Sequence, residues 1–453
     1  MKFLKTTVRL LAAATGFILT LASCSGDDYM KAIPANSEAI ASIDTEQMQQ
    51  QLASTLESAL GIAEIQSIGI DYGARLFAFQ TKTGYYGLCA KLSDADETEE
   101  FFKKQQAALK AQPLRTRSGF LLTSIQDKWV VGFSDDALLL LGPVAPKDIA
   151  VAQQQLVGFL KQKEISASNS RMLSTLDSIQ SSLSLVARAQ ALPSGITAPF
   201  TLGVSDDART GAMDKVYIRA GLTFKDDCVL IEGSSFSYDA KTDQQLQQAR
   251  SVFRPVQGKY TASVSSQAAV SLLTNVDGKE FLPLLKRSGS AVGSLLTLLN
   301  TTIDFDKIIQ SVDGDLCLQL HSALGEKSAF ALVAQLKDHA WISDLPYWQK
   351  SCPQGASLTE IGVGRYAYTS GSEGYCFGLT PDNQFYSGTT IDQAEASLKP
   401  SPTPLPASIS GQIKGQPLVL IVNAERLLGA NEAARSLAGK ILGQTQTIVY
   451  ILK

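Results

Sequence analysis

Residues 88–94 read LCAKLSD, and residues 332–338 read LVAQLKD. In both places a short apolar run typical of a strand leads directly into residues that favour a helix start. Three further pairs of segments follow in the same order: ASI at 41–43 with ASV at 262–264, GFSDD at 132–136 with GLTPD at 378–382, and VYI at 216–218 with VYI at 449–451. The number of residues that separates the two members of a pair varies from one pair to the next, as differing loop lengths would cause. The chain is therefore predicted to hold two tandem copies of one unit, residues 38–255 and 258–453.

Each copy is predicted to be α+β, with a mainly antiparallel sheet packed with helices. In the first copy we expect strands at 38–43, 74–80, 85–92, 119–125, 128–133, 137–141, 200–204, 216–224 and 228–236. We expect helices from Asp44, with an apolar stripe of Met48, Leu52, Leu56 and Leu60, from Ser93, and over 147–163, 169–192 and 243–252. The second copy is expected to carry a longer helical region, in several pieces, over 267–310.

The second copy ends at Lys453, just past its VYI strand, whereas the first continues into another strand and a helix. It is therefore predicted to be shortened at its C-terminus, with an uncovered sheet edge beside 447–452. Cys89 aligns with Val333, and Cys376 with Val130. Because the other copy carries an apolar residue at each position, these thiols are expected to pack and not to react.

The first residues resemble a secretory leader. Lys2, Lys5 and Arg9 precede an apolar run at 10–21. This run holds about 12 residues, whereas a spanning helix needs roughly 20, so residues 1–23 are predicted to be a signal peptide. The last four residues, Leu21, Ala22, Ser23 and Cys24, resemble the lipobox of bacterial lipoproteins.

In such proteins the cysteine becomes the first residue of the mature chain, and its thiol carries the diacylglycerol. Residues 24–37 are then a lipidated tether, and Cys24 is the membrane-binding residue. More than one lipid chain is needed for stable anchoring. The alternative is an ordinary cleaved leader in which Cys24 is incidental. Ser25-Gly26-Asp27-Asp28 resembles a short acidic signal for export to the cell surface, but a periplasm-facing outer-membrane location stays open.

Composition limits the remaining classes of function. Hydrophobic residues make up 45% and charged residues 18%, which is typical of a globular protein. The net charge of −3 comes from interspersed signs, so nucleic-acid binding is not expected. Five cysteines remain after Cys24, with no CxxC pair, and the two histidines, His321 and His339, lie in no metal-binding motif. We expect no metal and no cofactor.

Several features taken together resemble the Bacteroidota lipoproteins that carry domain of unknown function 4836. They are the lipobox, the acidic tether, the segment IPANS at 33–37 before a strand, and the hairpin FSDDAL at 133–138. The resemblance covers most of the chain. It implies a bacterial envelope location and names no reaction.

One aromatic cluster could bind a ligand. Trp341, Asp344, Tyr347 and Trp348 place aromatic rings beside a carboxylate, as sugar-binding sites do. The alternative, and the commoner role of rings at this spacing, is the buried face of a short helix. A second segment, Pro400–Pro406, has proline at every second position and is expected to be a stiff internal connector.

No catalytic motif is present in the sequence: HExxH, GxSxG and the Walker A loop do not occur. The leading hypothesis is a non-enzymatic, lipid-anchored outer-membrane protein that presents a recognition or assembly surface. A surface glycan-binding component and a hydrolase with an unrecognised site are the two alternatives.

Overall fold

The computed structural model describes residues 27–46, 68–192, 213–287, 303–323, 329–429 and 445–453. The chain divides into two compact units, Met1–Ser174 and Thr175–Lys453. The predicted signal peptide, the helical stripe at 48–60 and the strand at 200–204 lie outside the described residues.

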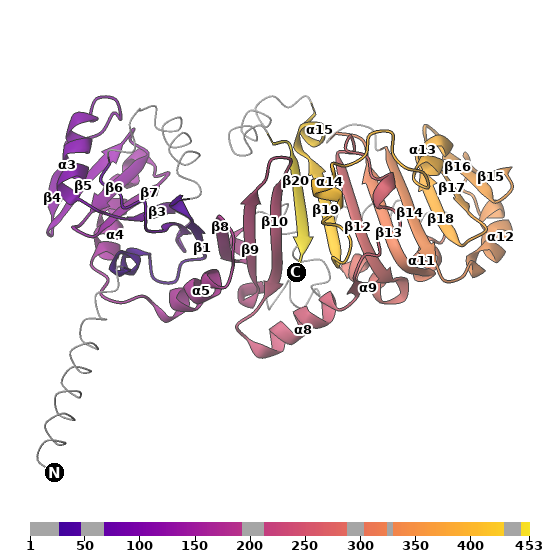
Figure 1. The fold of residues 1–453 in the computed structure, drawn as a ribbon, viewed down its shortest axis with the longest axis horizontal. Helices are drawn as coiled ribbons and strands as arrows, with labels where there is room; N and C mark the ends of the chain where they lie inside the picture. Colours follow the sequence, from indigo (N-terminus) through magenta and orange to yellow (C-terminus); the bar gives the residue numbers. More distant parts are fainter. Residues whose placement is uncertain (1–26, 47–67, 193–212, 288–302, 324–328, 430–444) are drawn as a thin grey trace, which may run out of the picture. The chain divides into compact units, whose positions relative to one another are not determined.

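Unit 1 is built on an antiparallel sheet in the order β1-β2-β3-β7-β6-β5-β4. The sheet is accompanied by two 3₁₀ turns and two helices that precede or follow its strands (Figure 1). The elements are η1 (Asp28–Ala32), β1 (Ala39–Ile43), β2 (Leu76–Gln80), β3 (Tyr86–Lys91), α3 (Ala95–Lys104), β4 (Arg115–Arg117), β5 (Phe120–Ile125), β6 (Trp129–Phe133), β7 (Ala137–Gly142), η3 (Pro146–Asp148) and α4 (Ile149–Leu160). Helix α5 (Ala167–Asp177) begins in this unit.

The helices of unit 1 cover opposite faces of its sheet. On β6, Gly132 and Phe133 are neighbours and so point to opposite sides. A Cβ at Gly132 would collide with Leu156 of α4, which shows that the helix lies against this face. Phe133 stacks on Phe102 of α3, with ring centroids 6.0 Å apart. Helix α4 therefore packs on one face and α3 on the other.

Unit 2 holds a larger sheet in the order β8-β9-β10-β20-β19-β12-β13-β14-β18-β17-β16-β15. All of these pairs are antiparallel except β10–β20, which is parallel. The strands are β8 (Leu183–Arg188), β9 (Tyr217–Phe224), β10 (Val229–Phe236), β11 (Phe253–Arg254), β12 (Val270–Asp277), β13 (Val312–Leu320), β14 (Phe330–Leu336), β15 (Ala356–Gly362), β16 (Arg365–Ser370), β17 (Glu373–Leu379), β18 (Gln384–Gly388), β19 (Leu418–Asn423) and β20 (Thr447–Leu452). The α+β prediction is confirmed.

Helices and 3₁₀ turns connect these strands. The helices are α8 (Ala240–Arg250), α9 (Gly278–Arg287), α11 (Phe305–Gln310), α12 (Leu345–Lys350), α13 (Ile391–Ala396), α14 (Ala407–Ser410) and α15 (Ala424–Leu428). The 3₁₀ turns are η4 (Ala189–Ala191), η5 (Met213–Lys215), η6 (Thr261–Ser263) and η7 (Ala340–Asp344).

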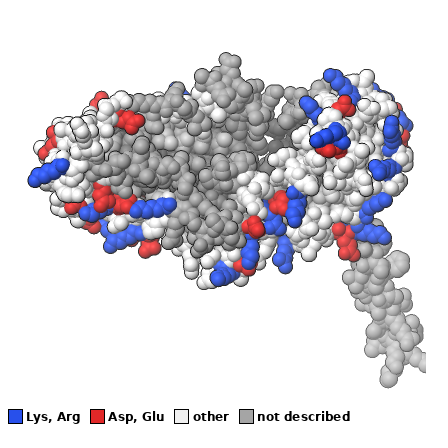
Figure 2. All heavy atoms as spheres, turned by 180° about the vertical axis from the view of Figure 1, so that it is seen from behind, with Lys and Arg blue, Asp and Glu red and all other residues white. Residues whose placement is uncertain are grey.

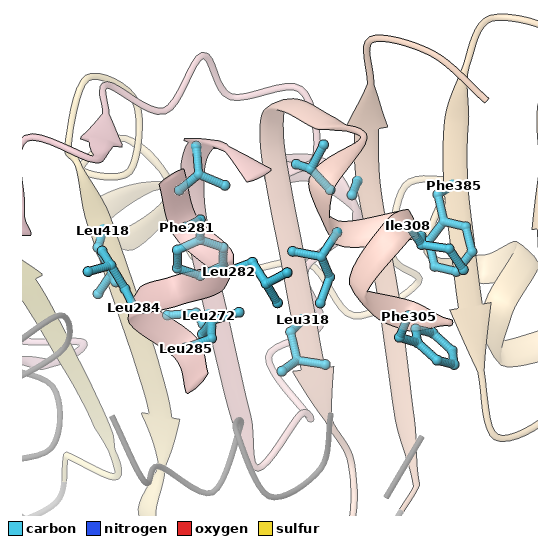
Figure 3. Packing of buried hydrophobic residues seen from close by; sticks show 14 of the residues in the cluster. Leu272, Phe281, Leu282, Leu284, Leu285, Phe305, Ile308, Leu318, Phe385 and Leu418 are labelled. Carbon is cyan, nitrogen blue, oxygen red and sulfur yellow. The ribbon is translucent and has the colours of Figure 1, made fainter. Parts of the chain in front are cut away.

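The central strands of unit 2 are buried on both faces. On β12, Leu272 belongs to one apolar cluster and its neighbour Leu273 to another. The first cluster includes Phe281 of α9 and Ile308 of α11 (Figure 3). The second includes Ile409 of α14. Strands covered on both sides read as continuous apolar runs, as LVLIV does at 418–422.

The predicted open edge beside 447–452 is wrong. Strand β20 pairs with β19 on one side and with β10 on the other, in the register Val229↔Ile448 to Gly233↔Leu452. Its middle residues Val449 and Tyr450 are buried. Strand β10, supplied by an earlier segment of the same unit, satisfies the backbone groups of β20 on that side.

Two helix predictions are also wrong. The helix expected over 169–192 ends at Asp177, and Leu183–Arg188 form β8 because they pair along their length with β9. Within the region expected to be helical over 267–310, Val270–Asp277 form β12 between β13 and β19. In both cases apolar residues at helical spacing also suit a strand buried between neighbours, so tertiary pairing decides.

The two units share a pairing order. In unit 1 the strands run β1-β2-β3-β7-β6-β5-β4, and in unit 2 the corresponding series is β12-β13-β14-β18-β17-β16-β15. This is what a duplication would produce. The duplication and its boundaries stay predictions, since the compact units divide at Ser174 and not near residue 256.

The predicted correspondence between residues 41–43 and residues 262–264 is wrong. Residues 262–264 lie at the end of η6 and not in a strand, so they do not correspond to 41–43 in β1. Their counterpart is the end of η1. The N-cap residues of η1 and η6 have the same backbone angles, φ −106° and ψ 8°, and the C-cap residues Ile33 and Val264 are both extended and buried.

The proline-rich connector packs on η6 and on the segment that follows it. Ser266 N donates to Thr403 O at 2.8 Å, and Ser401 N donates to Ala262 O at 2.9 Å. Leu405 is buried in the second apolar cluster of unit 2. The connector therefore contributes to the body of unit 2.

A buried carboxylate holds the chain that leads into η6. Asp315 on β13 is 2% exposed. It accepts hydrogen bonds from the backbone N–H groups of Gln257 (2.9 Å), Gly258 (2.8 Å) and Lys259 (2.8 Å). It also accepts one from Asn275 Nδ2 at 2.8 Å. A buried charge is tolerated only when it is satisfied in this way.

We expect Asp315→Ala to lower the free energy of unfolding of unit 2 by about 3 kcal/mol, because it leaves the buried Asn275 amide and three part-buried backbone N–H groups without an acceptor. Urea unfolding followed by tryptophan fluorescence measures this. The control is Asp313→Ala, which removes a half-exposed ion pair with Arg254 (2.8 Å) and should cost about 1 kcal/mol or less. Equal losses for the two variants would contradict the role given to Asp315.

Candidate functional site

The predicted lipidation site lies just before the first described residue. Leu21, Ala22, Ser23 and Cys24 are outside the described residues, and the structure begins at Asp27. Turn η1 follows at once, over Asp28–Ala32. The four steps from Cys24 to Asp28 span at most roughly 14 Å.

Turn η1 is fixed to unit 1 through Tyr29. This residue is 4% exposed, and its ring centroid lies 6.0 Å from that of Phe77. Its hydroxyl donates to Arg75 O at 2.7 Å, and Cys89 Sγ donates to Tyr29 O at 3.4 Å. Burial raises the pKa of the Tyr29 phenol above its usual value, so it stays a neutral donor.

Two amide side chains hold the segment between η1 and β1. Gln162, just after α4, donates to Ile33 O at 3.2 Å and accepts from Ala35 N at 3.1 Å. Asn169 of α5, fully buried, donates to Pro34 O at 2.8 Å and accepts from Ser37 N at 3.3 Å. The chain that would carry the lipid is thus part of the folded body from its fourth or fifth residue onward.

We expect Asn169→Ala to loosen this segment and to cost about 1–3 kcal/mol, because Ser37 N and Pro34 O lose a buried partner. Hydrogen exchange of the amides at 29–38 should become faster. Ser170→Ala, an exposed change on the same helix, is the control and should leave exchange at 29–38 unaltered. Unchanged exchange in Asn169→Ala would show that the segment is held by other contacts.

The structure divides the predicted aromatic cluster between the core and the surface. Trp341 and Trp348 are 2% and 3% exposed, and their rings stack in parallel with centroids 6.1 Å apart. Trp341 also packs edge-on against Phe385. Asp344 pairs with Lys307 Nζ at 2.6 Å, and only Tyr347 is well exposed, at 70%. This geometry favours the packing interpretation, since neither indole face is open to a sugar.

The burial of these indoles can be tested in solution. The third tryptophan, Trp129, is replaced by phenylalanine, which leaves Trp341 and Trp348 as the fluorophores. We expect iodide to quench the remaining emission far less than in a urea-unfolded sample. Strong quenching in the folded protein would restore an accessible aromatic site. Truncation by Trp341→Ala should cost about 3–5 kcal/mol.

The described cysteines and histidines occupy packed or isolated positions. Cys89, Cys228 and Cys317 are free and buried, and burial raises the pKa of the Cys317 thiol to about 12, so it is a poor nucleophile. Cys376 points away from the face that holds its neighbours Tyr375 and Phe377, whereas Cys352 packs on that face. The two thiols are therefore on opposite sides and free.

Neither histidine joins a cluster of ligands. Burial lowers the pKa of His321, and His339 Nδ1 lies 3.0 Å from Asn383 Oδ1. Within the ranges that the structure describes, no group of three or more His, Cys, Asp or Glu side chains could hold a metal ion. Figure 2 shows Lys and Arg interspersed with Asp and Glu on the face that it presents, in keeping with the low net charge.

These observations define an α+β protein with a large, mostly antiparallel sheet. The chain belongs to the family described as a domain of unknown function, DUF4836, whose model matches residues 35–399. The family predicted from the sequence is thus confirmed, while the bacterial phylum and the lipoprotein character stay predictions.

Comparison with other proteins adds little beyond the family. No curated protein matches the chain. Among solved structures, crystal form I of TP0453 is 10% identical with a TM-score of 0.33, covering 51% of this chain and 87% of that one. Crystal form III of TP0453 is 8% identical with a TM-score of 0.26, covering 81% and 96%. TM-scores this low support no inference about fold or function. In the described part of the chain, no helix is long and apolar enough to cross a bilayer.

Proposed function

We propose that this chain is a lipid-anchored protein of the outer membrane, held through Cys24, whose two α+β units present a surface for recognition or assembly without catalysing a reaction. One observation supports it most. The residues that resemble a lipobox end three positions before Asp27, and Tyr29 is already buried in the core of unit 1.

This arrangement is what a lipid anchor requires. A thioether-linked diacylglycerol needs a cysteine at the start of the mature chain and no folded structure before it. Cleavage ahead of Cys24 would leave the contacts of Tyr29, Gln162 and Asn169 in place, because the residues that make them all follow Cys24. Anchoring by lipid chains also needs no spanning segment.

The proposed recognition surface is the outer surface of the strands and helices. No cavity is assigned to it. The rings predicted to bind sugar are buried or isolated, so the glycan-binding alternative has no aromatic platform at 341–348. The hydrolase alternative gains no support from the positions of His321, His339 and the cysteines described above.

We expect Cys24→Ser to abolish membrane attachment. In cell fractionation the native chain should be found with outer membranes and be extracted only by detergent, whereas the variant should lose its acyl chains. Intact-mass spectrometry of the detergent-extracted protein should show residues 24–453 plus a diacylglycerol-sized mass on the N-terminal peptide. An unmodified Cys24 in a membrane-free protein would overturn the proposal.

Protease added to intact cells distinguishes the two facings. Degradation of the chain without lysis supports a cell-surface position, and protection until lysis supports a periplasmic one. Either result is compatible with the lipid anchor.

A further inference from the structure

The shortness of the tether restricts which side of unit 1 can face a membrane. If Cys24 is lipidated, Asp28 lies within roughly 14 Å of the bilayer surface. Asp28 opens η1, which is fixed to unit 1 by Tyr29. The side of unit 1 that carries η1 must therefore be close to the lipid head groups.

Helix α4 lies on that same side. The thiol of Cys89 on β3 contacts Tyr29 of η1. Across the sheet, Cys89 lies opposite Leu139 on β7, and Leu139 lies opposite Gly132 on β6. Residues directly opposite one another on neighbouring strands share a face, and Gly132 is the residue against which Leu156 of α4 packs. Gln162 then joins the end of α4 to the segment after η1 through two hydrogen bonds.

The outer surface of α4 has an unusual composition. No Lys, Arg, Asp or Glu occurs between Ile149 and Leu160. Its exposed positions carry Ala150, Val151, Gln154 and Gly158, and the Val151 side chain is 55% exposed. Helix α3, on the other face of the same sheet, carries six charged residues over Ala95–Lys104: Asp96, Glu97, Glu99, Glu100, Lys103 and Lys104.

The fold does not require an uncharged helix at this place. In unit 2, α13 follows β18 as α4 follows β7, and α13 bears Asp392 and Glu395. Glu395 pairs with Arg365 at 3.0 Å. A charged helix thus packs at the equivalent position in the sheet order, so packing on the sheet does not explain the lack of charge on α4.

Charged residues are placed at the ends of α4. Lys147 precedes it and Lys161 and Lys163 follow it, and all three are exposed. Asp148 and Glu164 lie beside them, so the segment has only a small positive excess. Lysines flanking an uncharged surface can reach phosphate groups while the surface between them meets the less polar boundary of the bilayer.

We propose that α4 and η1 form the side of unit 1 that rests on the phospholipid surface, with the uncharged outer side of α4 against the head groups. This inference rests on the proposed lipid anchor at Cys24 and adds an orientation to it. Introducing charge on this side of α4 would require desolvating that charge at the bilayer, whereas charge on α3 would not.

The test uses the lipidated full chain with Cys352 and Cys376 replaced by serine. It is reconstituted in vesicles of phosphatidylethanolamine and phosphatidylglycerol that contain a head-group nitroxide lipid. A fluorophore is attached at Gln154→Cys on α4 or, as the matched control, at Glu97→Cys on α3; both positions are exposed. We expect several-fold stronger quenching at position 154 than at position 97.

A charge variant sharpens the result. Ala150→Glu together with Val151→Glu should reduce quenching at position 154 while the protein stays bound to vesicles. Circular dichroism confirms that the variant is folded. Equal quenching at 154 and 97, or stronger quenching at 97, in protein that floats with the vesicles would overturn the orientation and leave the anchor intact. Lipidated protein that fails to float would instead overturn the proposed function.

Discussion

The parallel pairing of β10 with β20 is the interaction on which the architecture of unit 2 depends. A strand at the edge of a sheet offers a row of unsatisfied N–H and C=O groups, and such an edge favours aggregation. Here β20 is the last strand, yet it lies between β10 and β19. Because β10 already pairs with β9 on its other side, one strand links the segment 183–236 to the rest of the sheet. The sheet then stays continuous and can be buried on both faces.

A second constraint is the 3₁₀ turn that precedes β1 in unit 1 and β12 in unit 2. In both units a 3₁₀ turn with the same N-cap angles precedes an extended, buried apolar residue. The polar contacts that hold the two turns differ. In unit 2 the carboxylate of Asp315 accepts hydrogen bonds from three backbone N–H groups. In unit 1 the turn is held by Tyr29, and the following segment is held by Gln162 and Asn169. Only the unit 1 turn lies close in sequence to Cys24, the residue proposed to carry the lipid.

Much of the fold could be predicted from local pattern. The hairpins of unit 1 between 119 and 142 were expected because alternating apolar residues are separated by turn residues such as Ser134-Asp135-Asp136, whereas the short strand β4 was not expected. The start of α3 was expected at Ser93 and Asp94, and the Asp94 carboxylate accepts hydrogen bonds from the N–H groups of Asp96 and Glu97. Prediction failed at Leu183–Arg188 and Val270–Asp277, where apolar residues fit a helical stripe as well as a strand. The deciding factor in both was a neighbouring strand far away in the sequence.

For the candidate site, the sequence by itself determined the prediction of a lipid anchor at Cys24, because a thiol after small residues at the end of a short apolar run depends on residue type and order alone. It also determined the family and the α+β class, because strand and helix periodicities are local. Only the tertiary structure decided that the indoles of Trp341 and Trp348 stack inside the core and that Tyr347 remains outside. It alone placed α4 beside η1 and gave β20 a partner on each side. These outcomes depend on which surfaces meet when distant segments pack, and no local pattern carries that information.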